Sequence, residues 1–163
     1  MNTYTPILAT LGFVMSADQS STLLVHRNRR TMDVHYGKFN GLGGKVLAEE
    51  SIYECICREI NEEAGITCEQ VVLRGTINWQ GFGGDGEDWF GFIFRIDGYR
   101  GTPFTKNDDG ELIWHPVTQL HTLPMWEGDK QFLPMVFDAD PRVFHGVMPY
   151  RGEQPLSWRC ARL

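Results

Sequence analysis

The stretch from Gly44 to Ile66 constrains this 163-residue chain most, because it combines clear helix boundaries with an unusual concentration of acid. Ser51, followed three positions later by Glu54, has the pattern of a capping box, in which the two side chains satisfy free backbone N–H groups of the first turn. Gly65 is the residue type that ends a helix in the left-handed conformation. The stretch therefore predicts a helix that begins at Ser51 and stops before Gly65.

The predicted helix has an apolar side and an acidic side. At about 100° per residue, one stripe is expected to be buried: Tyr53, Ile56, Cys57, Ile60 and Ala64. The carboxylates of Glu59, Glu62 and Glu63 gather on a neighbouring strip, and Arg58 is placed to orient one of them. A hard divalent cation, which takes oxygen ligands, would relieve their repulsion. The alternative is a solvated acidic face that binds nothing.

The spacing of the whole stretch resembles the Nudix box, the signature of a family of hydrolases. The positions that the signature specifies are all matched, by Gly44, Glu50, Arg58, Glu59, Ile60, Glu62, Glu63, Gly65 and Ile66. The resemblance implies one domain over residues 1–163, with the Nudix α/β/α sandwich, a mixed β-sheet and the box (44–66) as loop, helix and loop. It also implies hydrolysis of a nucleoside diphosphate linked to another group. The implied cofactor is Mg²⁺, or Mn²⁺ in its place, held by Gly44, Glu59, Glu62 and Glu63.

The composition narrows the setting and the partners. A net charge of −6 argues against a broad nucleic-acid surface, but a small nucleotide can still bind through a metal. No apolar run approaches the roughly 18 residues needed to cross a bilayer, and the first residues lack the pattern of a signal peptide. The four cysteines form no CxxC pair. We therefore expect a cytoplasmic protein, monomeric or homodimeric, with a small-molecule nucleotide substrate and with no membrane or nucleic-acid partner.

Residues 6–15 and 22–26 are apolar runs on either side of a polar turn, and they predict a β-hairpin. A basic cluster, residues 27–30, follows the hairpin. It is either a solvated loop or a phosphate contact, for which arginine is well suited. The resemblance to MutT-like members of the family assigns the phosphate contact to Arg27, and it places Thr10 beside the substrate.

The segment 38–46 is dense in glycine, which lets a backbone approach a ligand closely. It resembles the WNGFGGKV stretch of the 8-oxo-dGTP diphosphatases within the family. That resemblance implies that Asn40 hydrogen-bonds a purine base and that Gly43 and Gly44 lie along the substrate. The alternative is that Asn40 only closes a turn.

Residues 71–79 and 88–96 predict strands joined by a flexible loop over 80–87. Trp79, at the end of the first of these strands, either lines a base pocket with Phe82 or packs in the core. Many MutT-like enzymes carry a further acid, before the strand predicted at 112–114, that binds metal or activates water. Asp109 and Glu111 are the two candidates, and the sequence does not choose between them.

Residues 123–134 resemble a MutT-like segment in which a tryptophan stacks on the base and an acid binds its edge. Trp126 and Asp129 match those positions, and aromatic faces are good stacking platforms for any base. Alternatively, Trp126 anchors a helix expected over 129–137. Human-type enzymes have two adjacent aspartates where this chain has Gly128 and Asp129. A closing hairpin is expected to turn at 151–153, and the histidines, which lack metal-ligand spacing, are expected to be structural or at the surface.

The resemblance thus implies hydrolysis of a purine nucleoside triphosphate, with 8-oxo-dGTP favoured, to the monophosphate and pyrophosphate. The metal would neutralise phosphate charge and help to generate the nucleophile, and a box carboxylate or the acid near Asp109 would serve as base. Two alternatives stay open. One is a Nudix hydrolase of another compound, such as the 5′-triphosphate end of RNA. The other is a catalytically silent nucleotide-sensing module, against which stands the complete set of box carboxylates.

Overall fold

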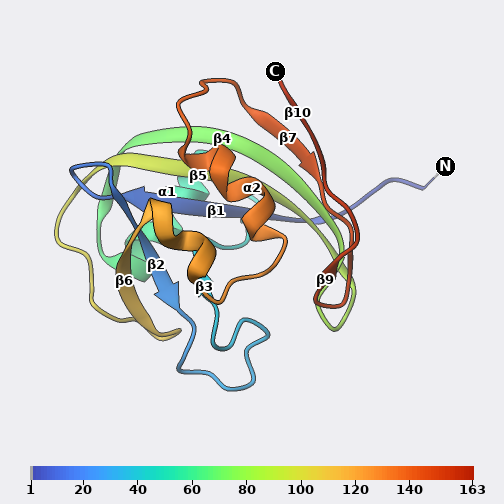
Figure 1. Cartoon of the computed structure of the whole chain (residues 1–163), viewed down its shortest axis with the longest axis horizontal. Coiled ribbons are helices and arrows are strands. Elements are labelled where there is room, and N and C mark those ends of the chain that lie inside the picture. The colour runs from blue at the N-terminus through green and yellow to red at the C-terminus, as the bar shows by residue number, and fades with distance from the viewer. Residues whose placement is uncertain (1) are drawn as a thin grey trace.

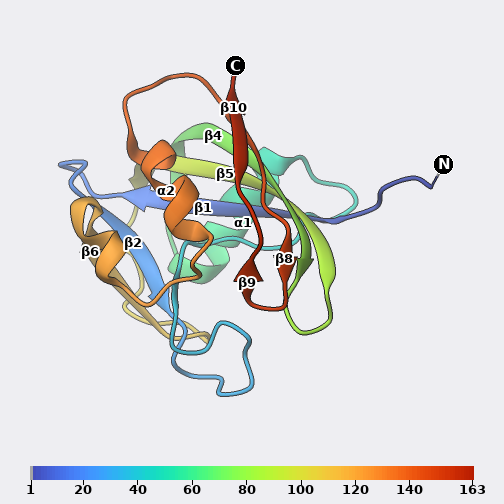
Figure 2. The same ribbon diagram turned by 45° about the vertical axis from the view of Figure 1, so that its right-hand side comes forward.

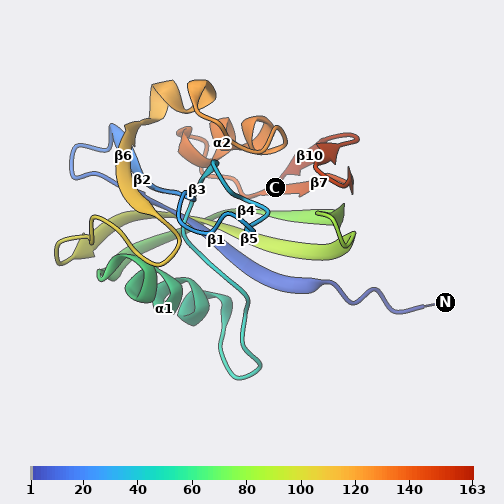
Figure 3. The ribbon, with the colours of Figure 1, turned by 90° about the horizontal axis from the view of Figure 1, so that it is seen from below.

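The computed structural model describes residues 2–163 and shows a mixed β-sheet between two layers of helix (Figure 1). The helix α1 covers one face and α2 the other (Figure 3). The elements in chain order are β1 (Ile7–Met15), β2 (Ser21–His26), β3 (Phe39–Asn40), α1 (Ile52–Ala64), β4 (Thr67–Phe82), β5 (Glu87–Arg100), β6 (Glu111–Pro116), the 3-10 helix η1 (Val117–Thr122), α2 (Asp129–Phe137), β7 (Phe144–Val147), β8 (Tyr150–Arg151), β9 (Gln154–Pro155) and β10 (Arg159–Arg162). The predicted α/β/α sandwich is confirmed. Within residues 2–163 no helix is long and apolar enough to cross a membrane.

The sheet follows the order β10-β7-β4-β5-β1-β2-β3, with β6 on the other edge of β2. The pairs β1/β5 and β4/β7 are parallel and the remaining pairs are antiparallel, so the sheet is mixed. The predicted hairpin joins β1 to β2. The loop expected over 80–87 is shorter than predicted, because β4 continues to Phe82 and β5 starts at Glu87.

The sheet splits where β1 and β2 diverge, and the glycine-rich segment enters the split. Only Val14 and Met15 of β1 pair with β2, whereas β6 pairs with β2 along its whole length. At the far end of β2, β3 takes the edge that β1 has left. The chain then follows β1 through antiparallel bridges at Leu42 and Lys45. The residues around Asn40 and Gly44 therefore lie between the diverging strands β1 and β2, where a site can form.

The helix α1 begins and ends as the sequence predicts. Ser51 accepts the backbone N–H of Glu54 at 3.2 Å, the Glu54 carboxylate accepts the N–H of Ser51 at 2.8 Å, and Gly65 ends the helix at φ 72°. The predicted buried stripe is partly wrong, because Tyr53 is 54% exposed while Cys55 is fully buried. The core side of the helix is rotated toward β1 and the box loop.

Two contacts explain this rotation. The Cys55 thiol lies 3.3 Å from the Thr10 hydroxyl, and it is 3.8 Å from the carbonyl oxygen of Gly44. Cys57, which was also expected to be buried, is only half-buried. The buried stripe of α1 consists of Cys55, Ile56, Ile60 and Ala64.

On the opposite face of the sheet, α2 begins at Asp129 as predicted. It packs in an apolar core cluster that includes Phe132, Phe144 and Trp126. The closing hairpin β8–β9 turns at residues 151–153 as expected. It lies against the turn between β4 and β5 (Figure 2), where the N–H of Gly83 donates to the carbonyl of Gly152 at 3.0 Å. This contact places Tyr150 beside Phe82, at the end of the sheet where β4 turns into β5.

Candidate active site

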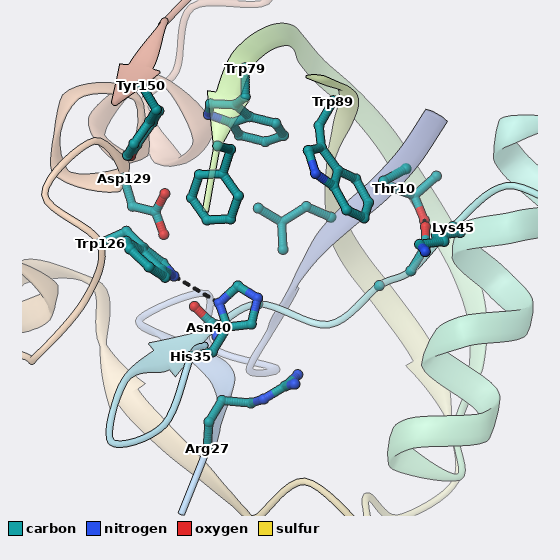
Figure 4. A pocket seen from close by; sticks show the side chains of 16 residues that line it. Thr10, Arg27, His35, Asn40, Lys45, Trp79, Trp89, Trp126, Asp129 and Tyr150 are labelled. Atoms are coloured by element: carbon teal, nitrogen blue, oxygen red, sulfur yellow. Dashed lines mark hydrogen bonds between the residues drawn. The ribbon is translucent and has the colours of Figure 1, made fainter. Parts of the chain in front are cut away.

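A cavity of about 350 Å³ opens at the split between β1 and β2 (Figure 4). Its walls come from β1, the loop between β2 and β3, the segment after β3, the adjoining ends of β4 and β5, the start of α2 and β8. All the residues predicted to bind substrate line it: Thr10, Arg27, Asn40, Gly43, Gly44, Trp79, Trp126 and Asp129. The fold thus brings together side chains that are far apart in the sequence.

Glycine is required where the box loop passes between β1 and α1. Gly43 has φ 156°, and a Cβ atom there would collide with the carbonyl oxygen of Thr10. A Cβ atom on Gly44 would lie 2.5 Å from a carboxylate oxygen of Glu59. The N–H of Gly43 donates to Glu63 Oε2 at 3.2 Å. The loop therefore lies directly on the acidic strip of α1.

Arg58 orients the box carboxylates. Its Nη2 and Nε atoms donate to the two oxygens of Glu50 at 2.6 and 2.9 Å. Its Nη1 donates to Glu59 at 2.7 Å and to Glu62 at 3.4 Å. The guanidinium does not line the cavity described here, so its contacts are with acids rather than with the space that a substrate would fill.

Glu63 is the most perturbed of these acids. Burial, together with the charges of Glu59 and Asp109, raises its pKa to about 8, although the Gly43 N–H and the charge of Arg27 act in the opposite direction. A raised carboxyl pKa marks negative charge that the surroundings do not fully compensate. Such perturbed groups concentrate at functional sites.

Of the two candidate acids in the loop before β6, Asp109 lies at the site. Its carboxylate is 3.4 Å from Arg27 Nη1 and 3.7 Å from Arg30 Nη1. Glu111 is exposed and pairs with His26 in the sheet. Asn107 fixes the Asp109 loop, because its side-chain amide donates to the Glu63 carbonyl at 3.1 Å and its oxygen accepts the Asp109 N–H at 2.9 Å. Nothing in the sequence pattern singled out Asn107.

The predicted metal ligands are oxygen donors whose type and charge fit a hard divalent cation. In this structure, however, their side chains do not converge on one point. Among residues 2–163, no three carboxylate, imidazole or thiol groups converge as a ready metal site. The reason is that Arg58 holds Glu59 and Glu62, while Glu63 turns to Gly43. Oxygen donors with an excess of negative charge are the set that such a cation takes. Rotation of these side chains would be needed to bring them together.

Trp126 forms the wall of the cavity that lies opposite Thr10 and Lys45 (Figure 4). Only 4% of it is exposed, and Lys38 Nζ lies 4.5 Å from the centre of its ring. The indole Nε1–H donates to His35 Nδ1 at 2.8 Å, and the ring of Phe82 meets that of Trp126 edge-on with centroids 4.9 Å apart. Trp126 is therefore both a buried anchor and a wall of the cavity, and its stacking on a base stays a prediction.

Asp129 stands beside Trp126 at the first turn of α2. Burial raises its pKa to about 7, and burial together with the charge of Asp129 raises the pKa of Tyr150. A side chain at position 128 would collide with the Tyr150 hydroxyl and with Met148. Gly128, in place of a second aspartate, is thus what allows the start of α2 to approach Tyr150.

Trp79 lines the cavity and also packs edge-on against Phe132, with centroids 6.2 Å apart, so its core role is confirmed and its contact with a base stays a prediction. Sequence reasoning missed several wall residues, among them His35, Trp89 and Tyr150. His35 fits the expectation of a structural histidine in its hydrogen bond with Trp126, but it also lines the cavity. Trp89 is the cross-strand partner of Trp79, a signal that becomes readable only with the strand register.

Residues 6–136 match the sequence profile of the NUDIX domain. The chain is 30% identical, over 153 residues, to the oxidized purine nucleoside triphosphate hydrolase of Danio rerio, covering 94% of this chain and 92% of that protein. It is 32% identical to the uncharacterized Nudix hydrolase YvcI of Bacillus subtilis, covering 72% and 75% respectively. The crystal structure of the MutT protein from Bacillus halodurans superposes with a TM-score of 0.81 at 29% identity, covering 94% of this chain and 97% of that one. The box, the fold and these likenesses agree, and the chain belongs to the Nudix hydrolase family.

Proposed function

We propose that this enzyme hydrolyses purine nucleoside triphosphates to the monophosphate and pyrophosphate, with oxidised purines such as 8-oxo-dGTP preferred. One observation carries the proposal: a single cavity is lined by Asn40, Trp126 and Asp129 and also by Arg27, Gly43 and Gly44 at the box carboxylates. This arrangement suits a ligand with an aromatic base and a phosphate chain. The Danio rerio relative is named for the same substrate class.

At the phosphate end, Arg27 would neutralise and position the phosphates. Its Nε donates to Asp33 at 2.7 Å and its Nη1 lies 3.4 Å from Asp109, so the guanidinium is held in place before any ligand arrives. Groups fixed in advance lose little conformational freedom on binding. We assign the role of the further acid to Asp109 rather than to Glu111.

Nudix hydrolases generally use divalent metals, and we propose Mg²⁺ here, with Mn²⁺ as a substitute. Glu59, Glu62, Glu63 and the carbonyl oxygen of Gly44 would hold it. When bound, such an ion neutralises phosphate charge and makes water more acidic. The carboxylate of Asp109 or Glu63 would take the proton of the attacking water.

At the base end, Trp126 would stack on the purine and Asn40 and Asp129 would bind its edge. The Asn40 amide offers both a donor and an acceptor. With a pKa of about 7, Asp129 is partly protonated near neutral pH, so it can donate to a carbonyl oxygen as well as accept from an N–H. Hydrogen bonds of this kind discriminate strongly between bases, because an unmatched base leaves buried polar groups unpaired.

A substrate panel with Mg²⁺ tests the proposal. It comprises 8-oxo-dGTP, dGTP, dATP, 2-hydroxy-dATP, ADP-ribose, dinucleoside polyphosphates and triphosphorylated RNA, compared by kcat/KM. We expect a preference for 8-oxo-dGTP over dGTP of tenfold or more, which is about 1.4 kcal/mol of transition-state discrimination. A clear preference for triphosphorylated RNA or for ADP-ribose would overturn the proposed substrate. Because the four cysteines are free thiols, we place this activity in the cytoplasm.

A further inference from the structure

We propose that His35 determines base specificity: its Nε2–H donates a hydrogen bond to a carbonyl oxygen on the purine and so favours oxo-purines over amino-purines. The proposal rests on the function proposed above and names a further residue of the same site. His35 lies in the loop between β2 and β3, a loop that no sequence pattern connected with the base. It lines the cavity beside Trp126, to which it is hydrogen-bonded (Figure 4).

The hydrogen bond from Trp126 determines which nitrogen of His35 carries the proton. The indole Nε1–H can only donate, so at 2.8 Å the His35 Nδ1 atom must be the acceptor. A neutral imidazole has a single N–H, which is then on Nε2. Trp126 therefore converts His35 from an ambiguous group into a fixed donor.

The second nitrogen is free to use that proton. Within residues 2–163, His35 Nε2 has no hydrogen-bond partner, and it is not among the buried polar atoms that lack one, so it is open to the cavity. Figure 4 shows this nitrogen on the side of the ring that faces away from Trp126. A donor that is fixed, unpaired and accessible in a ligand cavity can bind an acceptor atom of the ligand.

The ring stays neutral and in place. Burial and the positive charges of Arg27 and Lys38 outweigh the charge of Asp33 and lower the pKa of His35 to about 4, so near neutral pH the ring is not an imidazolium. The backbone N–H of His35 donates to Asp33 Oδ1 at 3.0 Å, and the carbonyl of His35 accepts the N–H of Lys38 at 2.9 Å. The Asp33 carboxylate also binds Arg27 and so connects this donor to the phosphate end of the cavity.

The chemistry that this donor selects follows from the base edges. At the 6-position an oxo-purine presents an acceptor where an amino-purine presents a donor, and at the 8-position an oxidised purine presents an acceptor where the normal base has only a C–H. Two donors that face each other leave both unpaired in a buried site, which is costly. The relevant ratio is kcat/KM for the oxo-purine divided by kcat/KM for the purine that lacks this oxygen. We therefore expect His35 to raise this ratio tenfold or more.

Two replacements separate the donor from the ring's structural contact. In His35→Asn the amide sits near the position of Nδ1, so it can still accept from Trp126 but places no donor at Nε2. In His35→Gln the amide nitrogen reaches the position of Nε2 and can donate. The exposed His121, on η1, gives the control His121→Asn. The substrate pairs are dITP with dATP, which differ at the 6-position, and 8-oxo-dGTP with dGTP, which differ at the 8-position.

We expect His35→Asn to lower one of the two substrate ratios at least tenfold, His35→Gln to keep it within about threefold, and His121→Asn to match the wild type. The ratio that changes identifies the oxygen that His35 binds. Unchanged ratios in His35→Asn, or equal losses in both His35 variants, would overturn the proposal. A wild-type enzyme that hydrolyses no purine nucleoside triphosphate would instead refute the proposed function itself. If a variant lacks turnover, binding without metal, followed by tryptophan fluorescence, gives the same two comparisons with dIMP and dAMP and with 8-oxo-dGMP and dGMP.

Discussion

The guanidinium of Arg58 binds the carboxylate of Glu50 through two parallel hydrogen bonds, with Nη2 2.6 Å from Oε1 and Nε 2.9 Å from Oε2. This pairing holds the loop that precedes α1 against the helix. Because two of its donors are committed to Glu50, the same guanidinium can reach Glu59 only with Nη1, at 2.7 Å. Glu50 thus limits how strongly Arg58 can bind the carboxylates that are proposed to hold metal.

Replacing Glu50 with glutamine should therefore impair metal use more than folding. Without the negative charge, Arg58 can turn toward Glu59 and Glu62 and compete with a cation for them. We expect kcat to fall at least tenfold, about 1.4 kcal/mol, and the Mg²⁺ concentration for half-maximal rate to rise. Glu49→Gln, at the exposed neighbouring position, should leave both quantities unchanged. An unaltered Mg²⁺ dependence in Glu50→Gln would contradict this account of Arg58.

Glu62 gives the most direct test of the metal site. Its side chain is 59% exposed and its contact with Arg58 is long, so replacing it should cost little stability. We expect Glu62→Gln to lower kcat/KM at least a hundredfold in Mg²⁺ while Tm stays within about 1 °C of the wild type. Glu69→Gln, an exposed change in β4, is the matched control. Unchanged turnover in Glu62→Gln would remove this residue from the proposed ligand set.

The sequence predicted the parts of the fold that depend on local rules. The capping box at Ser51, the glycine stop at Gly65 and the start of α2 are each determined by neighbours in the chain. The fixed spacing of the box placed the acids of α1 near the glycine loop, and in the structure Glu59 lies against Gly44 and Glu63 accepts the N–H of Gly43.

What the sequence could not give depends on long-range packing. Cys55 rather than Tyr53 faces inward because the split of the sheet puts Thr10 and the box loop against that side of the helix. Asp109 rather than Glu111 lies against Arg27, in a loop that Asn107 ties to the end of α1. His35 reaches Trp126 through an aperiodic loop whose course no pattern of hydrophobic residues records.

The stability of the protein should report the half-buried acid Asp129 at the base end of the cavity. The pKa of Asp129 is raised from 3.8 to about 7, so between about pH 4 and pH 7 the folded protein keeps a proton that the unfolded chain has lost. The contribution of this group to stability therefore falls as pH rises through that window and levels off above it. Asp129→Asn, which carries no charge, should remove this loss.

Other acids also titrate in this window, so the measurement is a comparison of two proteins at two pH values. We expect urea unfolding to show that Asp129→Asn gains on the wild type between pH 5 and pH 8, by an amount of order 2 kcal/mol at about 1.4 kcal/mol per pKa unit. Glu127→Gln, an exposed change nearby, should show no such gain. If the difference between Asp129→Asn and wild type is the same at both pH values, Asp129 is not held protonated by burial.

The far end of α2 depends on a buried arginine. Arg74 is 3% exposed, and it donates to the carbonyls of Met135, Val136, Asp138 and Asp140 and to the Asp138 carboxylate at distances from 2.8 to 3.3 Å. The last carbonyls of a helix have no partners within it, and a cation there satisfies them and complements the helix dipole. This contact fixes the helix whose first residue, Asp129, faces the cavity.

Arg74→Met keeps the length of the side chain and removes its donors. Arg95 and Arg162 contact some of the same carbonyls and can compensate only in part, because the Asp140 carbonyl receives its hydrogen bond from Arg74. We expect urea unfolding to show a loss of about 2 kcal/mol or more, since buried acceptors are left unpaired. Arg159→Met, an exposed change in β10, should stay within about 0.5 kcal/mol of the wild type. Equal stability of the two variants would mean that the end of α2 is held by apolar packing on the core rather than by Arg74.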